Sequence, residues 1–198
     1  MIILGADTSL PILSVALLRD DEIVGAIALE GKGSRNEKLL PALDWLLAEG
    51  NISRESIDLF AVTRGPGSFT GVRIGLATIQ GLALALGKPV CAISTHEAIA
   101  LGSGQSDAVV VDDAGRGEFY ISEFRGGREL VPPHLGSSAP AGAIIASEFM
   151  QRSNVALAAA RRATQIANEG HVDRYADVRP IYVRLAEAEV KLQQKRNG

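Results

Sequence analysis

One stretch of the sequence, RGPGSFTGVRIG at residues 64–75, has the composition of a loop that could bind an anion such as phosphate. Gly65 and Gly67 permit backbone angles that other residues avoid, and Pro66 fixes the turn between them. A helix that begins behind such a turn presents free N–H groups, and the arginines of the stretch would add positive charge. A tight structural turn explains the same residues. Spacing alone favours that alternative, because the stretch matches neither a Walker loop nor GxGxxG.

A buried strand and a helix are predicted on either side of this loop. Residues 57–63 form a short apolar run, which is typical of a buried strand. Residues 72–86 lack proline and are rich in Ala, Leu and Ile, which indicates a helix. Ser68 or Thr70 could cap this helix, and Gly87 would end it.

The composition limits the classes of function. The chain has 198 residues, of which 46% are hydrophobic, and a formal net charge of -3. An acidic chain is unsuited to bind nucleic acid by itself, because that requires a basic face. Cys91 is the single cysteine, so no disulfide can form within the chain. We find no leader segment and no apolar run of the ~20 residues needed to span a membrane, and therefore expect a cytoplasmic protein.

The second half of the sequence begins like the first. The apolar run 2–6 ends in Asp7, and the apolar run 108–111 ends in Asp112. Residues 7–15 and 112–120 then occupy matching places in two strand, acid, turn, strand units. Such an internal repeat predicts a duplicated α/β fold.

We place the division between the two halves in the Gly- and Ser-rich segment 102–106, which gives domains at 1–103 and 104–198. The second half is predicted to be abbreviated. Residues 127–147 show little periodicity and are expected to form loops and a short strand. A helix is predicted at 156–168 and a strand at 180–185.

Neither a metal centre nor a nucleophile is predicted. The three histidines, His96, His134 and His171, are far apart, and no two lie at i and i+4 on one helix. Cys91 lies in an apolar run, where it acts as a small hydrophobe. Ser68 is not part of a GxSxG nucleophile elbow. We therefore assign no catalytic residues and no metal ligands.

Taken together, these motifs resemble the TsaB (YeaZ) family, accessory subunits of bacterial tRNA threonylcarbamoyladenosine synthesis that are related to the M22 glycoprotease-like proteins. The resemblance is carried by residues 3–9, 37–41, 64–75, 80–83 and 94–95, and more weakly by 112–120 and 180–184. It implies the actin-like ATPase fold, also called ASKHA or ribonuclease H-like.

In that fold, the loop after the first strand is a phosphate loop. The resemblance therefore implies that a vestigial phosphate loop is formed by Asp7, Thr8, Ser9, Gly65 and Gly67. Residues alone favour a different role for Asp7, an Asx-type turn in which it bonds its own backbone. We expect no required cofactor and only weak binding of ATP or ADP.

A partner interface is predicted on the helices at 34–48 and 70–86. In the second helix Gly71, Gly75, Thr78, Leu82 and Ala85 form a seam of mostly small residues. Such a seam permits close packing, either against a partner or against the protein's own sheet. The family implies contact with TsaD or with a second copy, through the residues Leu39, Leu40, Leu43, Leu47, Gly71, Gly75, Thr78 and Leu82.

The resemblance implies a non-catalytic subunit that binds and activates TsaD, which forms threonylcarbamoyladenosine at position 37 of tRNA. A TsaE-like ATPase would join the assembly, tRNA would be reached only through the complex, and the chain alone would form a homodimer. TsaD carries a helical histidine pair for its metal, whereas residues 34–38 contain no histidine. Asn36 also departs from the histidine common in TsaB proteins. The alternatives are a free-standing ASKHA-type hydrolase or phosphotransferase, and a purely structural homodimer.

Overall fold

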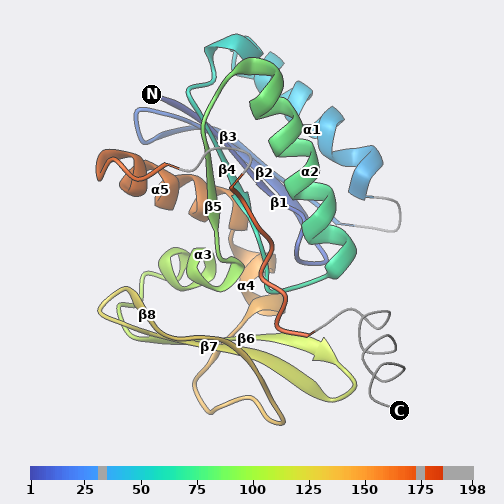
Figure 1. Ribbon diagram of the computed structural model, residues 1–198, viewed down its shortest axis with the longest axis vertical. Helices are drawn as coiled ribbons and strands as arrows, with labels where there is room; N and C mark the ends of the chain where they lie inside the picture. Colours follow the sequence, from blue (N-terminus) through green and yellow to red (C-terminus); the bar gives the residue numbers. More distant parts are fainter. Residues whose placement is uncertain (31–34, 173–176, 185–198) are drawn as a thin grey trace.

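In the computed structural model, which describes residues 1–30, 35–172 and 177–184, two β-sheets are stacked into two lobes (Figure 1). The first sheet has the strand order β3-β2-β1-β4-β5, and the second has the order β8-β7-β6-β9. The strands of the first sheet are β1 (Ile2–Asp7), β2 (Leu13–Arg19), β3 (Glu22–Leu29), β4 (Leu59–Thr63) and β5 (Val90–Ile93). Those of the second are β6 (Ala108–Gly115), β7 (Glu118–Arg125), β8 (Arg128–Gly136) and β9 (Ile144–Ile145).

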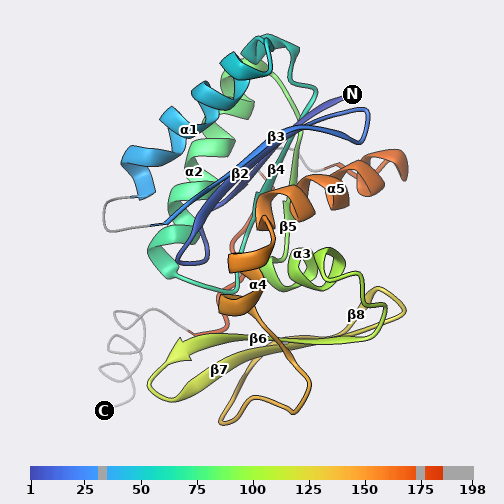
Figure 2. The ribbon, with the colours of Figure 1, turned by 180° about the vertical axis from the view of Figure 1, so that it is seen from behind.

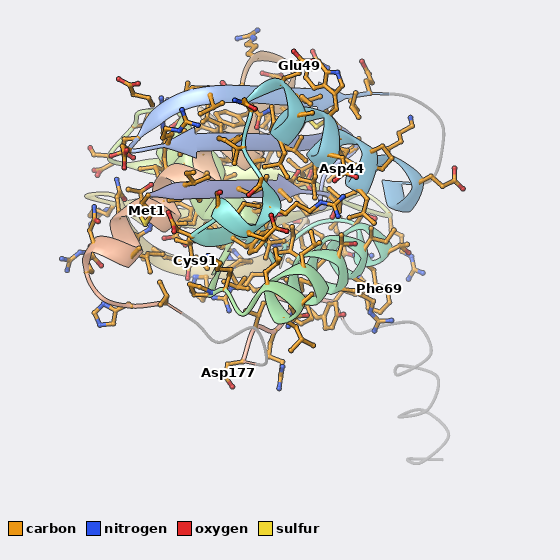
Figure 3. All side chains as sticks on the ribbon, turned by 90° about the horizontal axis from the view of Figure 1, so that it is seen from above. Met1, Asp44, Glu49, Phe69, Cys91 and Asp177 are labelled. Atoms are coloured by element: carbon orange, nitrogen blue, oxygen red, sulfur yellow. The ribbon has the colours of Figure 1, made fainter. Side chains whose placement is uncertain are left out.

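Helices cover both faces of the first sheet, as the opposite views of Figures 1 and 2 show. One face packs against α1 (Arg35–Glu49) and α2 (Phe69–Leu86), and the other against α5 (Val155–Asn168). The inner face of the second sheet packs against α3 (Thr95–Gly102) and α4 (Ala146–Arg152). Side chains fill the space between the first sheet and its helices (Figure 3).

The two sheets are built in the same way, which confirms the predicted duplication and the actin-like α/β class. β1 pairs antiparallel with β2 and parallel with β4, with Asp7 opposite Ser14. β6 pairs antiparallel with β7 and parallel with β9, with Asp112 opposite Tyr120. The aspartates of the two repeats therefore occupy equivalent positions at the ends of equivalent strands.

The ends of α2 agree with the sequence. Ser68 is the N-cap, and its side chain accepts a hydrogen bond from the N–H of Gly71. Gly87 ends the helix in the left-handed conformation, with φ of 64°. The short side chain at one end and the missing side chain at the other thus set the length of α2. Ser34, the expected start of α1, lies outside the described residues.

Two predictions in the second half are wrong. Residues 127–147 were expected to form loops and a short strand; the short strand β9 is there, but so are the nine-residue strand β8 and the first two residues of α4. Pro132 and Pro133 made a strand at β8 difficult to predict, because proline is unfavourable inside a sheet. They are tolerated because β8 is an edge strand with one unpaired side. The strand expected at 180–185 is absent from its described part, residues 180–184.

Helix α5 comes from the second half of the sequence but packs on the first sheet. Its N-cap Asn154 accepts a hydrogen bond from the N–H of Leu157 through its side chain, at 2.9 Å. Five alanines of α5 are buried, and their small size lets the helix approach the sheet closely: Ala156, Ala158, Ala159, Ala160 and Ala163. The division at residue 103 stays a prediction.

Candidate functional site

Asp7 ends β1 inside the protein, where its side chain is fully buried. Its Oδ1 accepts hydrogen bonds from the N–H of Ser9, at 3.1 Å, and from the hydroxyls of Ser9 and Thr63. Its Oδ2 has no hydrogen-bond partner among the described residues. Burial raises the pKa of this carboxyl, and the bonds from Ser9 and Thr63 oppose the rise. The bond to the backbone two residues on is the predicted Asx-type turn.

The next two residues are also held by bonds within the chain. Thr8 donates its hydroxyl to the carbonyl of Gly71 at 2.6 Å. The hydroxyls of Ser9 and Thr95 are 2.9 Å apart and hydrogen-bonded. The hydroxyl groups that a phosphate loop would direct at its ligand are therefore engaged inside the protein.

The glycine loop packs directly on this segment. The N–H of Ser68 donates to the carbonyl of Ser9 at 2.8 Å. A Cβ at Gly67, where φ is 147°, would lie 2.6 Å from the Ser9 carbonyl oxygen. Gly67 is thus required both for the backbone angle and for the close approach to Ser9. These contacts favour the tight structural turn over the anion site, the two alternatives that the sequence left open.

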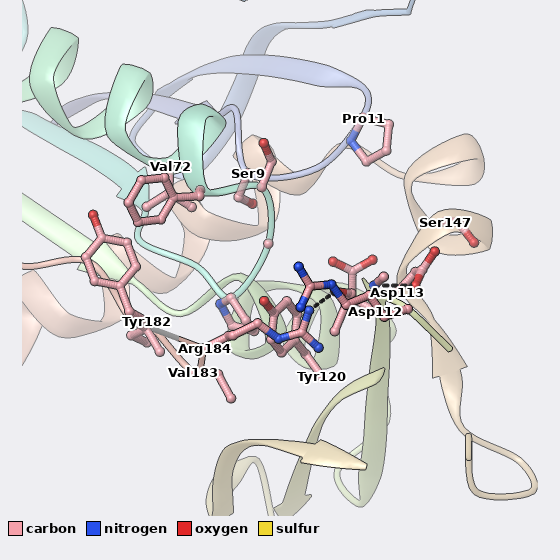
Figure 4. Close-up of a pocket in the computed structure, with 18 residues that line it drawn as sticks. Ser9, Pro11, Val72, Asp112, Asp113, Tyr120, Ser147, Tyr182, Val183 and Arg184 are labelled. Atoms are coloured by element: carbon pink, nitrogen blue, oxygen red, sulfur yellow. Dashed lines mark hydrogen bonds between the residues drawn. The ribbon is translucent and has the colours of Figure 1, made fainter. Parts of the chain in front are cut away.

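Between the two lobes lies a cleft of about 970 Å³, drawn in Figure 4. The glycine loop and the start of α2 line one side, and the end of β6 and its turn line the other. Of the five residues predicted for the phosphate loop, the structure places Ser9 and Gly67 at the cleft wall. The remaining wall residues include Pro11, Pro66, Val72, Asp112, Asp113, Arg116, Tyr120 and Ser147.

Asp112 carries the main electrostatic feature of the cleft. Burial raises its pKa to about 6, and the nearby charges of Asp113 and Asp7 act in the same direction. The backbone N–H of Asp113 donates to this carboxyl and opposes the shift. Asp7 of the first repeat therefore contributes to the raised pKa of Asp112, its counterpart in the second repeat.

Residues 177–184 form a segment that sequence reasoning missed, which we call the interlobe strap. Its Ile181 N–H donates to the carbonyl of Arg64 at 2.7 Å. Its Arg184 donates to the carbonyl of Ala114 at 3.1 Å and forms an ion pair with Glu118 on the second lobe. The strap thus joins the glycine loop of the first lobe to β6 and β7 of the second, along the cleft (Figure 4).

The strap also covers the start of α2 with an aromatic pair. The rings of Phe69 and Tyr182 lie 5.0 Å apart, and the guanidinium of Arg73 lies 3.8 Å from the centre of the Phe69 ring. Arg73 Nε also donates to the Tyr182 hydroxyl at 2.8 Å. Arg73, which would have added charge to an anion site, is held in these contacts.

Metal ligands and the three histidines are the remaining candidates for chemistry in the part of the chain that the structure describes. Within that part, no group of three or more His, Cys, Asp or Glu residues could hold a metal ion. His96 is buried, its Nδ1 bonds the Ser122 hydroxyl at 2.7 Å, and burial lowers its pKa to about 3. A histidine that stays neutral in this way links α3 to β7 and serves packing.

The structure corrects the residues predicted for the interface. Leu39, Leu43 and Leu47 of α1 are buried in the protein's own core, so a partner cannot reach them. Gly71 and Gly75 of α2 are also buried and face the segment at Thr8. The start of the predicted seam, at Gly71 and Gly75, therefore packs inside the protein, and of the eight residues predicted for the interface only Leu40, Thr78 and Leu82 reach the surface.

The outer surface of these two helices, which we call the α1–α2 outer face, keeps these three residues and adds others. Leu84 is 57% exposed and Leu40 43% exposed. The rest of the face consists of small or apolar residues that are exposed or half-buried: Ile74, Ala77, Thr78, Gly81, Leu82 and Ala85. Arg73 is the one charged residue in the whole of α2.

Comparisons with known proteins agree with this fold and these motifs. The family model for TsaD, described as tRNA N6-adenosine threonylcarbamoyltransferase, matches residues 32–177. The tRNA threonylcarbamoyladenosine biosynthesis protein TsaB of Bacillus subtilis is 33% identical over 63% of this chain and 56% of its own length. TsaB of Escherichia coli is 36% identical over 63% of this chain and 55% of its own. The chain thus spans about half the length of these curated relatives.

Two solved structures from Pseudomonas aeruginosa share the fold over most of the chain. One is YeaZ, with a TM-score of 0.75 and 25% identity over 91% of this chain and 99% of that one. The other is an uncharacterized protein described as similar to peptidase YeaZ, with a TM-score of 0.78 and 26% identity over 92% of this chain and 99% of that one. Because the duplicated sheets, the glycine loop and these matches agree, the chain belongs to the TsaB (YeaZ) family.

Proposed function

We propose that this chain is a non-catalytic subunit that binds and activates a TsaD-like threonylcarbamoyltransferase acting on tRNA. The observation that carries the proposal is the composition of α2. Its 18 residues have a mean hydropathy of 1.4, yet only 33% of them are buried within the chain. An apolar surface of this kind, rimmed by polar residues, is typical of a site that a partner covers.

A membrane is the other environment that could cover such a helix, because α2 is long and apolar enough to span one by length and composition alone. We favour a protein partner because one side of α2 is fixed on the first sheet, with Val72, Leu76, Ile79 and Ala83 in the core. A helix held in this way presents a single apolar face rather than an apolar circumference.

The state of the cleft supports a role without catalysis. The hydroxyls of Thr8 and Ser9 are engaged within the chain, and Arg73 and Arg184 are held in contacts of their own. A phosphotransferase would need such groups free to hold and neutralise a phosphate. The proposal extends to a TsaE-like ATPase in the same assembly, to tRNA reached only through the complex, to self-association in the absence of the paralogue, and to a cytoplasmic location.

The interface is tested with two leucines of matched exposure. Leu84→Glu puts a charge at the most exposed leucine of the α1–α2 outer face, whereas Leu130→Glu, at a leucine that is 54% exposed on β8, serves as the control. Loss of a packed apolar contact in an interface typically costs about 2 kcal/mol or more, so we expect Leu84→Glu to weaken binding to a TsaD-like paralogue by about 30-fold. Calorimetric titration that finds both variants equal to the wild type would contradict the assignment.

A further inference from the structure

An apolar groove lies between α1 and the edge strand β3, on the side of α1 away from the α1–α2 outer face. It has a volume of about 660 Å³, and we call it the β3 edge groove. Its walls come from four consecutive residues of the strand and from the outward side of the helix: Ala26, Ile27, Ala28, Leu29, Glu37, Lys38, Pro41, Ala42 and Trp45. The α1–α2 outer face does not include these residues, because Leu40 and Trp45 lie on different sides of α1.

The backbone beside this groove is open to pairing. Among the described residues, β3 pairs only with β2, and it forms one edge of the first sheet. In an antiparallel edge strand, alternate residues direct their N–H and C=O groups away from the sheet. Residues 23–29 also contain no proline and no charged side chain, which are two of the devices that prevent pairing at an edge. A third device, a β-bulge, is confined to the start of β3, where Leu18 pairs with Ile23 and Leu17 with Gly25.

Helix α1 lies alongside this edge and forms one wall of the groove. It is packed closely on β3, since a Cβ at Gly25 would lie 2.6 Å from Leu46 Cδ1. Trp45, one helical turn from exposed Pro41, is 56% exposed. A large aromatic side chain exposed on a fixed helix is well suited to anchor a partner, because it offers much apolar area for little loss of side-chain entropy.

The charges at the groove indicate what kind of strand would fit. Acidic residues lie at both ends of the uncharged run, Asp21 and Glu22 before it and Glu30 after it, whereas the groove wall on α1 carries one charge of each sign, at Glu37 and Lys38. A second copy is disfavoured, since antiparallel pairing of two β3 strands centred at Ala26 would place Glu22 against Glu30. A strand with basic residues at its ends would meet opposite charge at each end instead.

We propose that the β3 edge groove binds an extended segment of another protein, which adds to the first sheet as a further strand beside β3. Backbone hydrogen bonds to β3 would supply affinity, and side chains on one face of the segment would pack against Pro41 and Trp45. The segment has small apolar residues in its centre and Lys or Arg at its ends.

The full chain can be titrated with a synthetic peptide in which alternating Val and Thr residues are flanked by two Lys residues at each end. We expect saturable binding, together with slowed hydrogen exchange in the amides of residues 23–29. Trp45→Ala should weaken binding at least tenfold, and Glu22→Lys combined with Glu30→Lys should do the same at low salt. Leu40→Ala, an exposed position on the other side of α1, is the matched control and should bind like the wild type.

Ala26→Pro removes one backbone N–H from the strand and should weaken binding if the peptide pairs with β3. If the proline variant does not fold, the slowed exchange of residues 23–29 in the wild type tests the pairing, and Trp45→Ala tests the side-chain contact. No binding at millimolar peptide, or binding that is unchanged in Trp45→Ala, would overturn the proposal. Slowed exchange on α2 in place of β3 would also overturn it. Self-association of the chain that Trp45→Ala abolishes would assign the groove to a second copy, contrary to the proposal.

Discussion

Gly75→Ala is predicted to destabilise the folded chain rather than its association with a partner. A Cβ at this position would come closer than 3.0 Å to Thr8 Oγ1, which donates to the carbonyl of Gly71. Overpacking of this kind costs about 1–3 kcal/mol, and disrupting the buried hydrogen bond costs about 1–3 kcal/mol more. The better helix propensity of alanine offsets about 1 kcal/mol, which leaves a central loss of about 3 kcal/mol.

Thermal unfolding followed by circular dichroism measures this loss directly. For a chain of this size, about 3 kcal/mol corresponds to a fall in Tm of roughly 6–12 °C. Gly81→Ala on the same helix is the matched control, because Gly81 is exposed and a Cβ there meets nothing within 4 Å. It should gain up to about 1 kcal/mol from helix propensity. If Gly75→Ala kept the Tm of the wild type and lost partner binding, the inward orientation of Gly75 would be refuted.

Three further results are expected. Asp112→Asn should raise the free energy of unfolding by up to about 3 kcal/mol at pH 7.5 and have little effect at pH 3.5. The reason is that the raised pKa of Asp112 makes the stability of the wild type fall as pH rises from 3.8 to about 6. Denaturant titrations that find equal effects at both pH values would contradict this. ATP should bind with a Kd that is roughly millimolar, or ~4 kcal/mol, and a low-micromolar Kd by calorimetry would revive the phosphotransferase alternative. The chain alone should self-associate at micromolar concentration in sedimentation experiments, and Leu84→Glu should be monomeric; a monomeric wild type would count against the α1–α2 outer face.

The framework of the fold could be predicted because each of its main elements has a local signal. Apolar runs that end in Asp7 and Asp112 marked the two repeats, and Ser68 and Gly87 marked the ends of α2. Strand β8 carries two prolines, which lower its β-propensity, and it forms only because it lies at the edge of the sheet. The interlobe strap is held by contacts with distant residues such as Arg64 and Glu118, which local patterns do not contain.

The candidate site was predicted only in part, for a related reason. Periodicity placed Gly71 and Gly75 on one side of α2 but could not tell whether that side faces the sheet or a partner. Gly71 and Gly75 point inward, whereas Gly81 on the same helix is exposed. The hydrogen bonds of the Thr8 and Ser9 hydroxyls could not be predicted either, because their partners, Gly71 and Thr95, are far away in the sequence.

A reconstituted tRNA modification reaction tests the proposed function most directly. The chain, a TsaD-like paralogue, a TsaE-like ATPase, threonylcarbamoyl-adenylate and unmodified tRNA are combined, and threonylcarbamoyladenosine is measured by mass spectrometry. We predict that the paralogue modifies tRNA only when this chain is present, that Leu130→Glu supports the reaction, and that Leu84→Glu does not. Equal modification with and without the chain, or modification by the chain in the absence of the paralogue, would contradict the proposal.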